Sequence, residues 1–555
     1  MRIFISLMLV MAVLPSAFAA EMQVVVNSKD WRDVYSGTLY GYLTGNNVKY
    51  IVDESHGIDL ITKTLGRGRP VLLIESADNP QIAGYSRLMA SEGFTTETIS
   101  SENPLDTNLR LAEMLVSERD IRKYIVIDDT LGFSAMSVAS YAILTNSSVL
   151  FANKDNYREV YDFLSEHADE ILVYGQMNRL AKEELARLNP EFLNLGDKYA
   201  DNTELARLFL KVRPEARQVI FADGRYIEHS LFSGEYPTVF LGVSNIPPEV
   251  IEFINTSLMK TAIVIGYDLY PNSIRIRELT GIKIYLKFAR GVAGETYALE
   301  VFELPAYNPK VGIKGTRYNA ITSQIEVVYE NTGDVYTYLQ GISHEIFTGE
   351  NESVGIVGSD EPMFIDAGEI KAVTYDIDLG RYLEERLLVK SITLYGDSPK
   401  SLDRMQAENN IVEIISIDDK SEIAVKSIAY RKSTKRFEIT VENLGPDLVY
   451  TDAEIEDIII AEERATLSGE QISIPPGKEG IIKIRASLEP VDIEDNPTIT
   501  TVIRYGARSD ALLKSITEKS DLVVIGGIDP RVIVISGMAA GIGGLALLIF
   551  LRPRM

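Results

Sequence analysis

Residues that could carry catalysis are few in this 555-residue chain, and they are spread along it. Its four histidines are His56, His167, His229 and His344, and no two stand four residues apart, so the sequence holds no HExxH zinc motif. It contains neither the G-x-S-x-G turn of a nucleophilic serine nor a phosphate-binding Walker loop. The absence of cysteine excludes thiol nucleophiles, iron–sulfur clusters and cysteine-ligated zinc. We therefore expect no catalytic residue and no cofactor, and predict that the protein is not an enzyme.

Two acidic pairs stand directly after predicted strands, where α/β proteins commonly bind ligands. They are Asp53-Glu54 and Asp128-Asp129. A cation or a sugar could bind there, but acidic residues in this position also cap helices or are solvated in loops, and we favour this structural role. The stretch 66–70 reads GRGRP and could cradle a phosphate, yet it precedes a strand, whereas phosphate loops follow one. The metal content stays unknown, and a structural divalent cation is the one metal role left open.

Three Asn-x-Ser/Thr sequons could accept glycans in an exported protein. They begin at Asn146, Asn255 and Asn351. All three are candidate glycosylation sites, although chance matches are common. We expect Asn351, which lies in a polar loop, to be the best acceptor.

The two ends of the chain predict export and anchoring. Residues 1–19 combine a basic start, an apolar stretch and an A-F-A site, which is typical of a signal peptide cleaved after Ala19. Val532 to Leu551 carries no charge, so we predict a transmembrane helix over 531–551 and a cytoplasmic tail over 552–555. The protein would then be a single-pass type I protein of the cell membrane, with the bulk of the chain outside the cell.

The predicted membrane helix contains a G-x-x-x-G pattern formed by Gly537 and Gly541. This pattern lets two membrane helices pack closely. Small residues are also common in membrane helices for other reasons, so both interpretations stay open.

The composition describes a folded, acidic protein. The chain has 80 acidic and 55 basic residues, a net charge of −25, which argues against a nucleic-acid partner. Hydrophobic residues make up 46%, as in globular domains, so the chain is no disordered stalk. Because it has no disulfide, an exported chain of this kind must rely on large cores, which indicates a prokaryotic source.

Residues 20–295 predict a head of three similar α/β units, over about 23–120, 121–215 and 216–295. Apolar runs that suit buried strands recur roughly every hundred residues, and helical patterns follow them. Such alternation predicts parallel sheets with helical crossovers. The strands start at Gln23, Val48, Pro70, Tyr124, Ser148, Glu170, Gln218, Pro237 and Thr261.

The second unit resembles the cell-wall-binding type 2 repeat of prokaryotic surface proteins. Phe133-Ser134-Ala135 matches the start of that repeat's first helix, Val149-Leu150-Phe151 its second strand and Val173-Tyr174-Gly175 its third. The repeat's double glycine is replaced by Gly175-Gln176. The resemblance implies a pseudo-threefold module that binds wall polymers, and the whole layout resembles archaeal surface-layer (S-layer) proteins with immunoglobulin-like domains.

The second half of the chain predicts two immunoglobulin-like β-sandwiches, over 296–397 and 411–526, joined by a polar linker over 398–410. Tyr318 and Tyr430 stand 112 residues apart, and the strands that follow them align at the same offset. Alternating polar and apolar residues in both strands are typical of antiparallel sheets with one buried face.

These features favour a non-enzymatic surface protein. An S-layer or S-layer-associated subunit acting in envelope assembly or adhesion is the leading hypothesis, with two stacked sandwiches raising the head above the membrane. The partners would be neighbouring subunits, the membrane and a cell-surface polysaccharide. A receptor or carbohydrate-binding protein and an ectoenzyme are the alternatives. A deep polar pocket where the head's strand ends converge would favour these alternatives, whereas separate strand ends would favour assembly.

Overall fold

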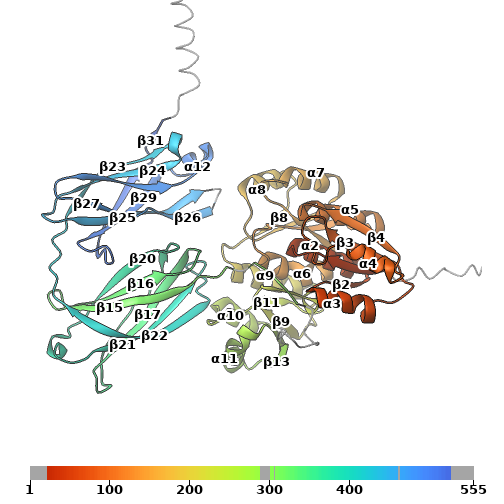
Figure 1. Cartoon of the computed structure of the whole chain (residues 1–555), viewed down its shortest axis with the longest axis horizontal. Coiled ribbons are helices and arrows are strands. Elements are labelled where there is room, and N and C mark those ends of the chain that lie inside the picture. Colours follow the sequence, from red (N-terminus) through yellow and green to blue (C-terminus); the bar gives the residue numbers. More distant parts are fainter. Residues whose placement is uncertain (1–21, 288–300, 306, 461–462, 527–555) are drawn as a thin grey trace, which may run out of the picture.

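The computed structural model describes residues 22–287, 301–305, 307–460 and 463–526. The predicted signal peptide, the transmembrane helix over 531–551 with Gly537 and Gly541, and the tail lie outside these ranges. Within them, no helix is both long enough and apolar enough to cross a membrane. The chain is multidomain, with parallel-sheet α/β units first and antiparallel sandwiches after them (Figure 1).

The head contains three four-stranded parallel sheets, each with its strands in the spatial order second, first, third, fourth. All nine predicted strands are present. The fourth strand of each sheet was not predicted, because these exposed edge strands lack a buried apolar run. The strands are β1(Gln23–Asn27), β2(Asn47–Tyr50), β3(Val71–Ser76) and β4(Thr96–Ser101); β5(Lys123–Ile127), β6(Ser147–Phe151), β7(Glu170–Tyr174) and β8(Glu191–Leu193); and β9(Gln218–Ala222), β11(Thr238–Phe240), β12(Thr261–Ile265) and β13(Lys283–Lys287).

Helices join each unit to the next. Asn108 of α5(Pro104–Arg119) binds the backbone of edge strand β6 through both ends of its amide, at 2.9 and 3.0 Å. Asn202 of α9(Lys198–Val212) does the same to β11 in the third unit, at 3.2 and 2.7 Å. An amide side chain thus extends each sheet edge, and the repetition of this contact fixes how consecutive units meet.

The remaining helices cover the sheets, and two of them form the shared core. Both α2(Trp31–Thr44) and α6(Phe133–Thr145) are buried on most of their surface, within one apolar core that spans all three units. The others are α3(Glu54–Asp59), η1(Leu60–Thr64), α4(Tyr85–Ser91), α7(Tyr157–His167), α8(Arg179–Ala186), η2(His229–Phe232), α10(Pro248–Thr256), η3(Tyr267–Leu269) and α11(Tyr270–Thr280).

The boundary predicted at residues 295 and 296 needs a correction. The strand β14(Val301–Glu303) belongs to the head, because it pairs antiparallel with β10(Tyr226–Glu228) of the third unit. The first sandwich begins only after this pairing. Three residues are too few to show a strand period, so the sequence did not reveal it.

The first sandwich, called sandwich 1, has two layers that share one strand. The strand β22(Arg404–Ile415) pairs antiparallel with β21 and then, at its end, parallel with β15. One layer holds β15(Val311–Asn319), β16(Gln324–Asn331) and β20(Ile370–Asp376), and the other holds β17(Thr337–Phe347), β18(Ser353–Val357), β19(Met363–Ile365) and β21(Leu388–Gly396), with the short helix η4(Gly380–Tyr382) between β20 and β21.

The predicted linker over 398–410 is therefore wrong. Residues 398–401 form a tight turn closed by a bridge between Ser398 and Ser401, and β22 starts at Arg404. The stretch MQAENN consists mostly of residues with good helix propensity, which hid the strand. Pairing with β21 overrides that propensity, as tertiary contacts often do.

The second sandwich, called sandwich 2, repeats this plan. Leu379 and Leu488 each donate a backbone N–H, at 3.1 Å, to the hydroxyl of the equivalent Tyr318 and Tyr430. One layer holds β23(Ile423–Arg431), β24(Arg436–Asn443), β28(Glu479–Arg485) and β31(Val524–Ile525); the other holds β25(Val449–Ile460), β26(Glu463–Ser468), β27(Ile472–Ile474), β29(Thr498–Gly506) and β30(Lys514–Asp521), with η5(Lys432–Thr434) and α12(Pro490–Asp495) in its loops.

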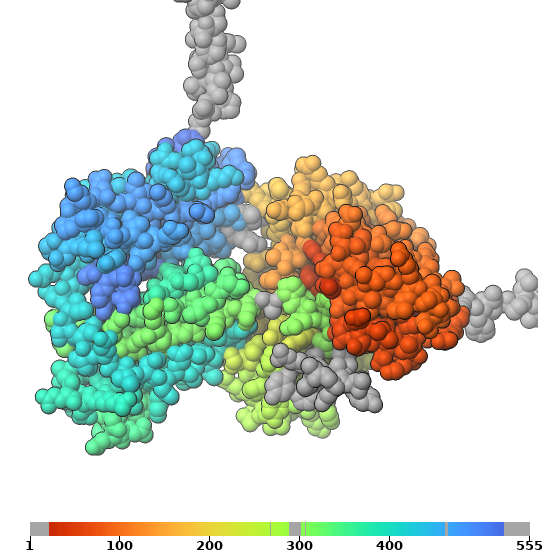
Figure 2. All heavy atoms as spheres, in the orientation of Figure 1, coloured from red at the N-terminus to blue at the C-terminus, as the bar shows by residue number. Residues whose placement is uncertain are grey.

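The head does not stand on top of the stacked sandwiches. Figure 1 shows the two sandwiches one above the other with the head at their side, and the space-filling view in Figure 2 shows it against both. The expectation that the sandwiches raise the head is therefore wrong. The sequence contains no direct signal of this placement, which depends on side-chain pairs between residues far apart in the chain.

Candidate functional site

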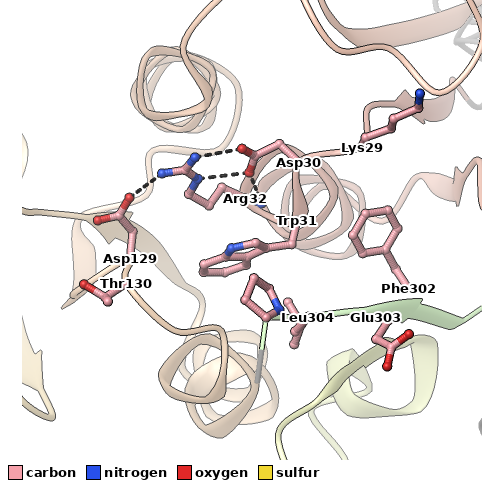
Figure 3. A pocket seen from close by; sticks show the side chains of 10 residues that line it. Lys29, Asp30, Trp31, Arg32, Asp129, Thr130, Phe302, Glu303 and Leu304 are labelled. Atoms are coloured by element: carbon pink, nitrogen blue, oxygen red, sulfur yellow. Dashed lines mark hydrogen bonds and ion pairs between the residues drawn. The ribbon is translucent and has the colours of Figure 1, made fainter. Parts of the chain in front are cut away.

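The strand ends of the first two units meet at one arginine. Arg32, at the start of α2, donates from Nε and Nη2 to the two carboxylate oxygens of Asp30, at 2.9 and 2.7 Å. Its Nη1 lies 2.6 Å from Asp129, which follows β5 in the second unit (Figure 3). Asn153 donates to the other oxygen of Asp129, at 2.8 Å. One guanidinium thus joins two units at the edge where their strands end.

The acidic pairs behave differently from one another. Asp53 caps α3 by accepting a hydrogen bond from the backbone of His56 at 2.7 Å, which confirms the capping prediction there. Capping does not apply to Asp128-Asp129, because α6 starts at Phe133 without a side-chain cap. Asp128 instead accepts from the backbone of Thr130, at 2.7 Å. Burial raises the pKa of Asp128, and Asp30 above all raises the pKa of Arg32.

The point where the strand ends converge is filled by the chain itself. After β14 the chain crosses these ends, and Leu304 is only 3% exposed there. A methyl group placed on Gly132 would come within 2.6 Å of the Leu304 side chain, so the two residues are in direct contact. Phe302, two residues earlier, packs edge-on against Tyr50 of the first unit, with ring centres 6.5 Å apart. The connector therefore occupies the space where the strand ends converge.

An open cleft of about 700 Å³ remains beside the connector. The indole of Trp31, the single tryptophan of the chain, forms part of its wall and is 6% exposed. The cleft is lined by Lys29, Asp30, Trp31, Arg32, Asp129, Thr130, Phe302, Glu303, Leu304 and Pro305. These side chains can form hydrogen bonds with a ligand, and the lining offers no histidine or other base paired with a nucleophile.

The other candidates from the sequence do not assemble around this cleft. The structure places the three sequon asparagines on exposed positions of different parts: Asn146 in the second unit, Asn255 in the third and Asn351 in sandwich 1. Ser148, the acceptor-motif serine after Asn146, is buried in β6. The GRGRP stretch forms a structural turn, since the Gln23 amide binds Gly66 through both its ends.

The four histidines also lie apart from one another, and His344 is a core residue of sandwich 1. It lies fully buried in sandwich 1 between the hydroxyls of Tyr329 and Ser391, at 2.8 and 2.9 Å. Burial lowers the pKa of His344 to about 4, so the ring is neutral at neutral pH. Across the described ranges, no group of three His, Asp or Glu side chains is placed to hold a metal ion.

Arg32 and Trp31 escaped the sequence analysis, although a signal for them exists. The triplet Asp-x-Arg follows the first strand of two units, as Asp30-Trp31-Arg32 and as Asp223-Gly224-Arg225. Both arginines bind the aspartate of their own triplet, and Arg225 also lies 2.9 Å from Asp268. A search for polar patterns shared between the units would have found them.

The second notable feature is the joint between the head and sandwich 1. It is formed by the turn between β21 and β22, residues 397–403, called the sandwich 1 turn. Lys198 of α9 lies 2.6 Å from Asp397, and the hydroxyl of Tyr199 donates to Asp403 at 2.6 Å. Burial alone would lower the pKa of Lys198, but Asp397 and Asp403 raise it, so the lysine stays charged. The backbone of Asn245 also donates to the Asp403 carbonyl, at 2.8 Å.

Sandwich 2 uses the equivalent turn to hold sandwich 1. This turn, between β29 and β30, is closed by a bridge between Arg508 and Ala511, as the sandwich 1 turn is by Ser398 and Ser401. Asp510 binds Arg317 of sandwich 1 at 2.5 Å. Arg508 pairs with the buried Glu326. Each sandwich therefore contacts the domain that precedes it in the chain through the same turn.

Two further ion-pair groups complete these joints. Between the sandwiches, Lys371 of β20 pairs with Glu454 of β25, and Arg504 lies 2.5 Å from the same carboxylate. Between the head and sandwich 2, Arg179 of α8 donates to Asp492 of α12 at 2.7 Å. The members of these pairs are largely buried, so removal of one partner would leave a buried charge uncompensated.

No protein-family model matches the chain, and no curated protein matches it either. Among solved structures, Cwp8 from Clostridium difficile is 16% identical over 47% of this chain and 48% of its own, with a TM-score of 0.38. Cwp6 from Clostridium difficile is 12% identical over 48% of this chain and 54% of its own, with a TM-score of 0.35. The chain spans about half the length of these structures, and likenesses this distant carry no argument about function.

Proposed function

We propose that the protein is a membrane-anchored structural protein of the cell surface, an S-layer or S-layer-associated subunit with two immunoglobulin-like sandwiches. It acts in envelope assembly or adhesion. The observation that carries this proposal is the repeated docking turn. Each sandwich holds the preceding domain through partly buried ion pairs, so the head and the sandwiches are joined into one block, as a lattice subunit requires.

The filled centre of the head supports the same proposal. A deep polar pocket at the strand ends would favour an enzyme or a receptor, whereas Leu304 fills the place where these ends converge and leaves only the open cleft beside it. The acidic surface adds to this, because a net charge of −25 keeps the subunits soluble before assembly and lets divalent cations link them afterwards.

Electron microscopy of envelopes from the source organism tests the proposal. We expect a two-dimensional lattice that disappears when the gene is deleted and returns with the unaltered chain. A chain with Lys198→Met and Arg179→Met should restore the membrane protein but not the ordered lattice, because the head loses its fixed position. An envelope unchanged by deletion would overturn the proposal.

A carbohydrate-binding role of the head is the second candidate, and the cleft beside Leu304 favours it. Phe302, which is half-buried, offers a ring for stacking, and Arg32, Asp30 and Asp129 offer donors and acceptors for sugar hydroxyls. Because Trp31 is the single tryptophan, its fluorescence reports on the cleft alone. Titration with cell-surface polysaccharide fragments should change this fluorescence in the intact chain and in Arg225→Ala, but not in Arg32→Ala. No change with any fragment would exclude this role.

A further inference from the structure

Sandwich 2 carries a cluster of positive charge on an otherwise acidic protein. The hairpin between β23 and β24 reads RKSTKR over residues 431–436, and we call it the basic tip. The equivalent hairpin of sandwich 1 reads NAITSQ over 319–324 and has no charge. The two hairpins share their backbone, since Ser323 and Lys435 take the same left-handed conformation, with φ of 55° and 48°. The charge is therefore not required by the fold of the hairpin.

The positive charges are crowded and incompletely neutralised. Arg436 lies directly opposite Arg431 on β23 and opposite Arg485 on β28. One carboxylate, Glu438, serves the first two, at 2.8 Å from each. Arg485 and Lys432 form no ion pair with any residue that the structure describes. Like charges placed opposite each other destabilise a sheet, so an external anion at this site would stabilise the fold.

Exposed apolar side chains lie next to the basic tip. Strand β31 pairs with β23 so that Ile525 lies opposite Arg431. Ile525 is 41% exposed and Val523 is 51% exposed. A surface that combines lysine and arginine with exposed aliphatic side chains is typical of proteins that lie on a membrane, where the charges contact headgroups and the aliphatic groups contact the acyl boundary.

The position of the tip points to the same partner. In sandwich 1 the uncharged hairpin faces the next domain, because Asn319 donates to the carbonyl of Ile417 in the connection to sandwich 2, at 2.8 Å. The basic tip occupies the same end of sandwich 2, next to β31, which pairs with β23 there and which Figure 1 shows on the side of sandwich 2 away from sandwich 1. Val532, the start of the predicted membrane helix, stands seven positions after Ile525, a span of at most about 25 Å.

We propose that the basic tip, with Val523 and Ile525, rests on the anionic lipid headgroups of the membrane that anchors the chain. The inference rests on the proposed function in one respect, that residues 531–551 span the membrane. The contact fixes the angle at which the block of head and sandwiches stands on the membrane. Each lysine or arginine close to an anionic surface strengthens the contact about fivefold.

The absence of cysteine allows a direct test in the full chain. A fluorophore on Ser433→Cys reports the position of the basic tip, and one on Ser323→Cys reports the matching hairpin of sandwich 1. The chain is inserted into vesicles that carry an acceptor dye on their headgroups. We expect energy transfer from position 433, but not from 323, to be stronger in vesicles of equal parts phosphatidylglycerol and phosphatidylcholine than in phosphatidylcholine alone, and to fall with salt.

Charge reversal supplies the matched variants. The double variant Lys432→Glu with Lys435→Glu should lower, at least roughly tenfold, the ratio of molecules whose basic tip contacts the membrane to molecules whose tip does not. Lys154→Glu with Lys260→Glu, on exposed positions of the head, changes the net charge equally and should have no effect. Transfer from position 433 that does not depend on lipid charge, or that survives the reversal of Lys432 and Lys435, would overturn the proposal.

The same vesicles separate this inference from the anchor that it rests on. If an alkaline wash removes the chain from the vesicles, the chain does not span the bilayer. That result contradicts the predicted membrane helix but not the proposed contact of the basic tip with lipid. Flotation of that released chain with phosphatidylglycerol vesicles then tests the tip alone. Binding that is lost in the Lys432 and Lys435 variant supports the contact between the basic tip and anionic lipid. Absence of binding overturns it.

Discussion

The two sandwiches share one strand arrangement but have different side chains at matching positions of their cores. In sandwich 1, His344 lies opposite Ser391 and its ring contacts the hydroxyl of Tyr329. In sandwich 2 the matching cross-strand pair is Ile455 and Thr501. His344 is tolerated in one core because both nitrogens of its ring are hydrogen-bonded, whereas Ile455 at the matching position of the other core contributes apolar burial. The comparison shows that the plan resides in turns and strand register rather than in any fixed set of core residues.

The docking turns extend this comparison to the surface. The turn of sandwich 1 presents two aspartates, Asp397 and Asp403, to a lysine of the head. The turn of sandwich 2 presents one of each sign, Arg508 and Asp510, to an arginine and a glutamate. The same backbone feature thus selects a different neighbour by its charges. Four predictions test the comparison between the two sandwiches, in order of decreasing expected change in the free energy of unfolding.

The largest effect is expected at the joint between the sandwiches. Arg504→Met leaves Glu454 and Asp452 with one cation fewer, and both carboxylates are buried. Breaking such a group costs about 3–5 kcal/mol. Urea unfolding followed by circular dichroism should show this loss in the transition of the sandwiches, with the head transition changed much less. A loss below about 1 kcal/mol would mean that water reaches this joint.

The buried histidine should give sandwich 1 a pH dependence that sandwich 2 lacks. Since the pKa of His344 is lowered to about 4, the unfolded chain binds more protons than the folded one between about pH 6.5 and 4. The contribution of His344 to the free energy of unfolding is therefore fully present above about pH 6.5. It falls by up to about 3 kcal/mol as the pH decreases to 4. Unfolding curves at several pH values measure this loss.

His344→Gln provides the control for this pH effect. Glutamine retains a donor and an acceptor between Tyr329 and Ser391 but does not titrate, so the loss between pH 6.5 and 4 should shrink. An equally steep loss in the variant would assign it to carboxylates whose pKa the fold lowers, such as Glu454, where Lys371 and Arg504 outweigh the effect of burial.

An equal effect in both sandwiches is expected at two equivalent asparagines. Asn331 accepts from the backbone of Gly333 at 3.0 Å and donates to the carbonyl of Val335 at 2.8 Å. Asn443 makes the matching bonds to Gly445 and Asp447, both at 2.8 Å. Either substitution to alanine should cost about 2 kcal/mol, because backbone groups lose their partners. Costs that differ by more than about 1 kcal/mol would show that the two turns are not equivalent.

The smallest effect is expected from an exposed ion pair of the same type. Arg464 lies 3.8 Å from Asp457, and both side chains are largely exposed in sandwich 2. Arg464→Met should change the unfolding free energy by less than about 0.5 kcal/mol, since solvent screens such pairs. It is the matched substitution for Arg504→Met. A similar cost for the two would contradict the assignment of the large effect to burial.

Much of the architecture was predictable from the sequence, because it rests on local patterns. Nine strands of the head and the duplicated sandwiches follow from apolar runs and from repeats at fixed offsets, such as Tyr318 and Tyr430. Strand β22 was missed because its helix-forming residues are overruled by a partner strand. The ion pairs Arg32–Asp129 and Lys198–Asp397 could not be predicted, because each joins residues that only the packing of two separate units brings together.

The crossing of the head by residues 301–305 has a mechanical consequence. A force that pulls the sandwiches away from the head is transmitted along the backbone to Leu304 and to the three-residue pairing of β14 with β10. The sandwich 1 turn offers a second route in parallel, through Lys198 and Tyr199 to Asp397 and Asp403. While that turn holds, the load bypasses the connector. The turn therefore acts as a strain relief that keeps the core of the head intact under such a force.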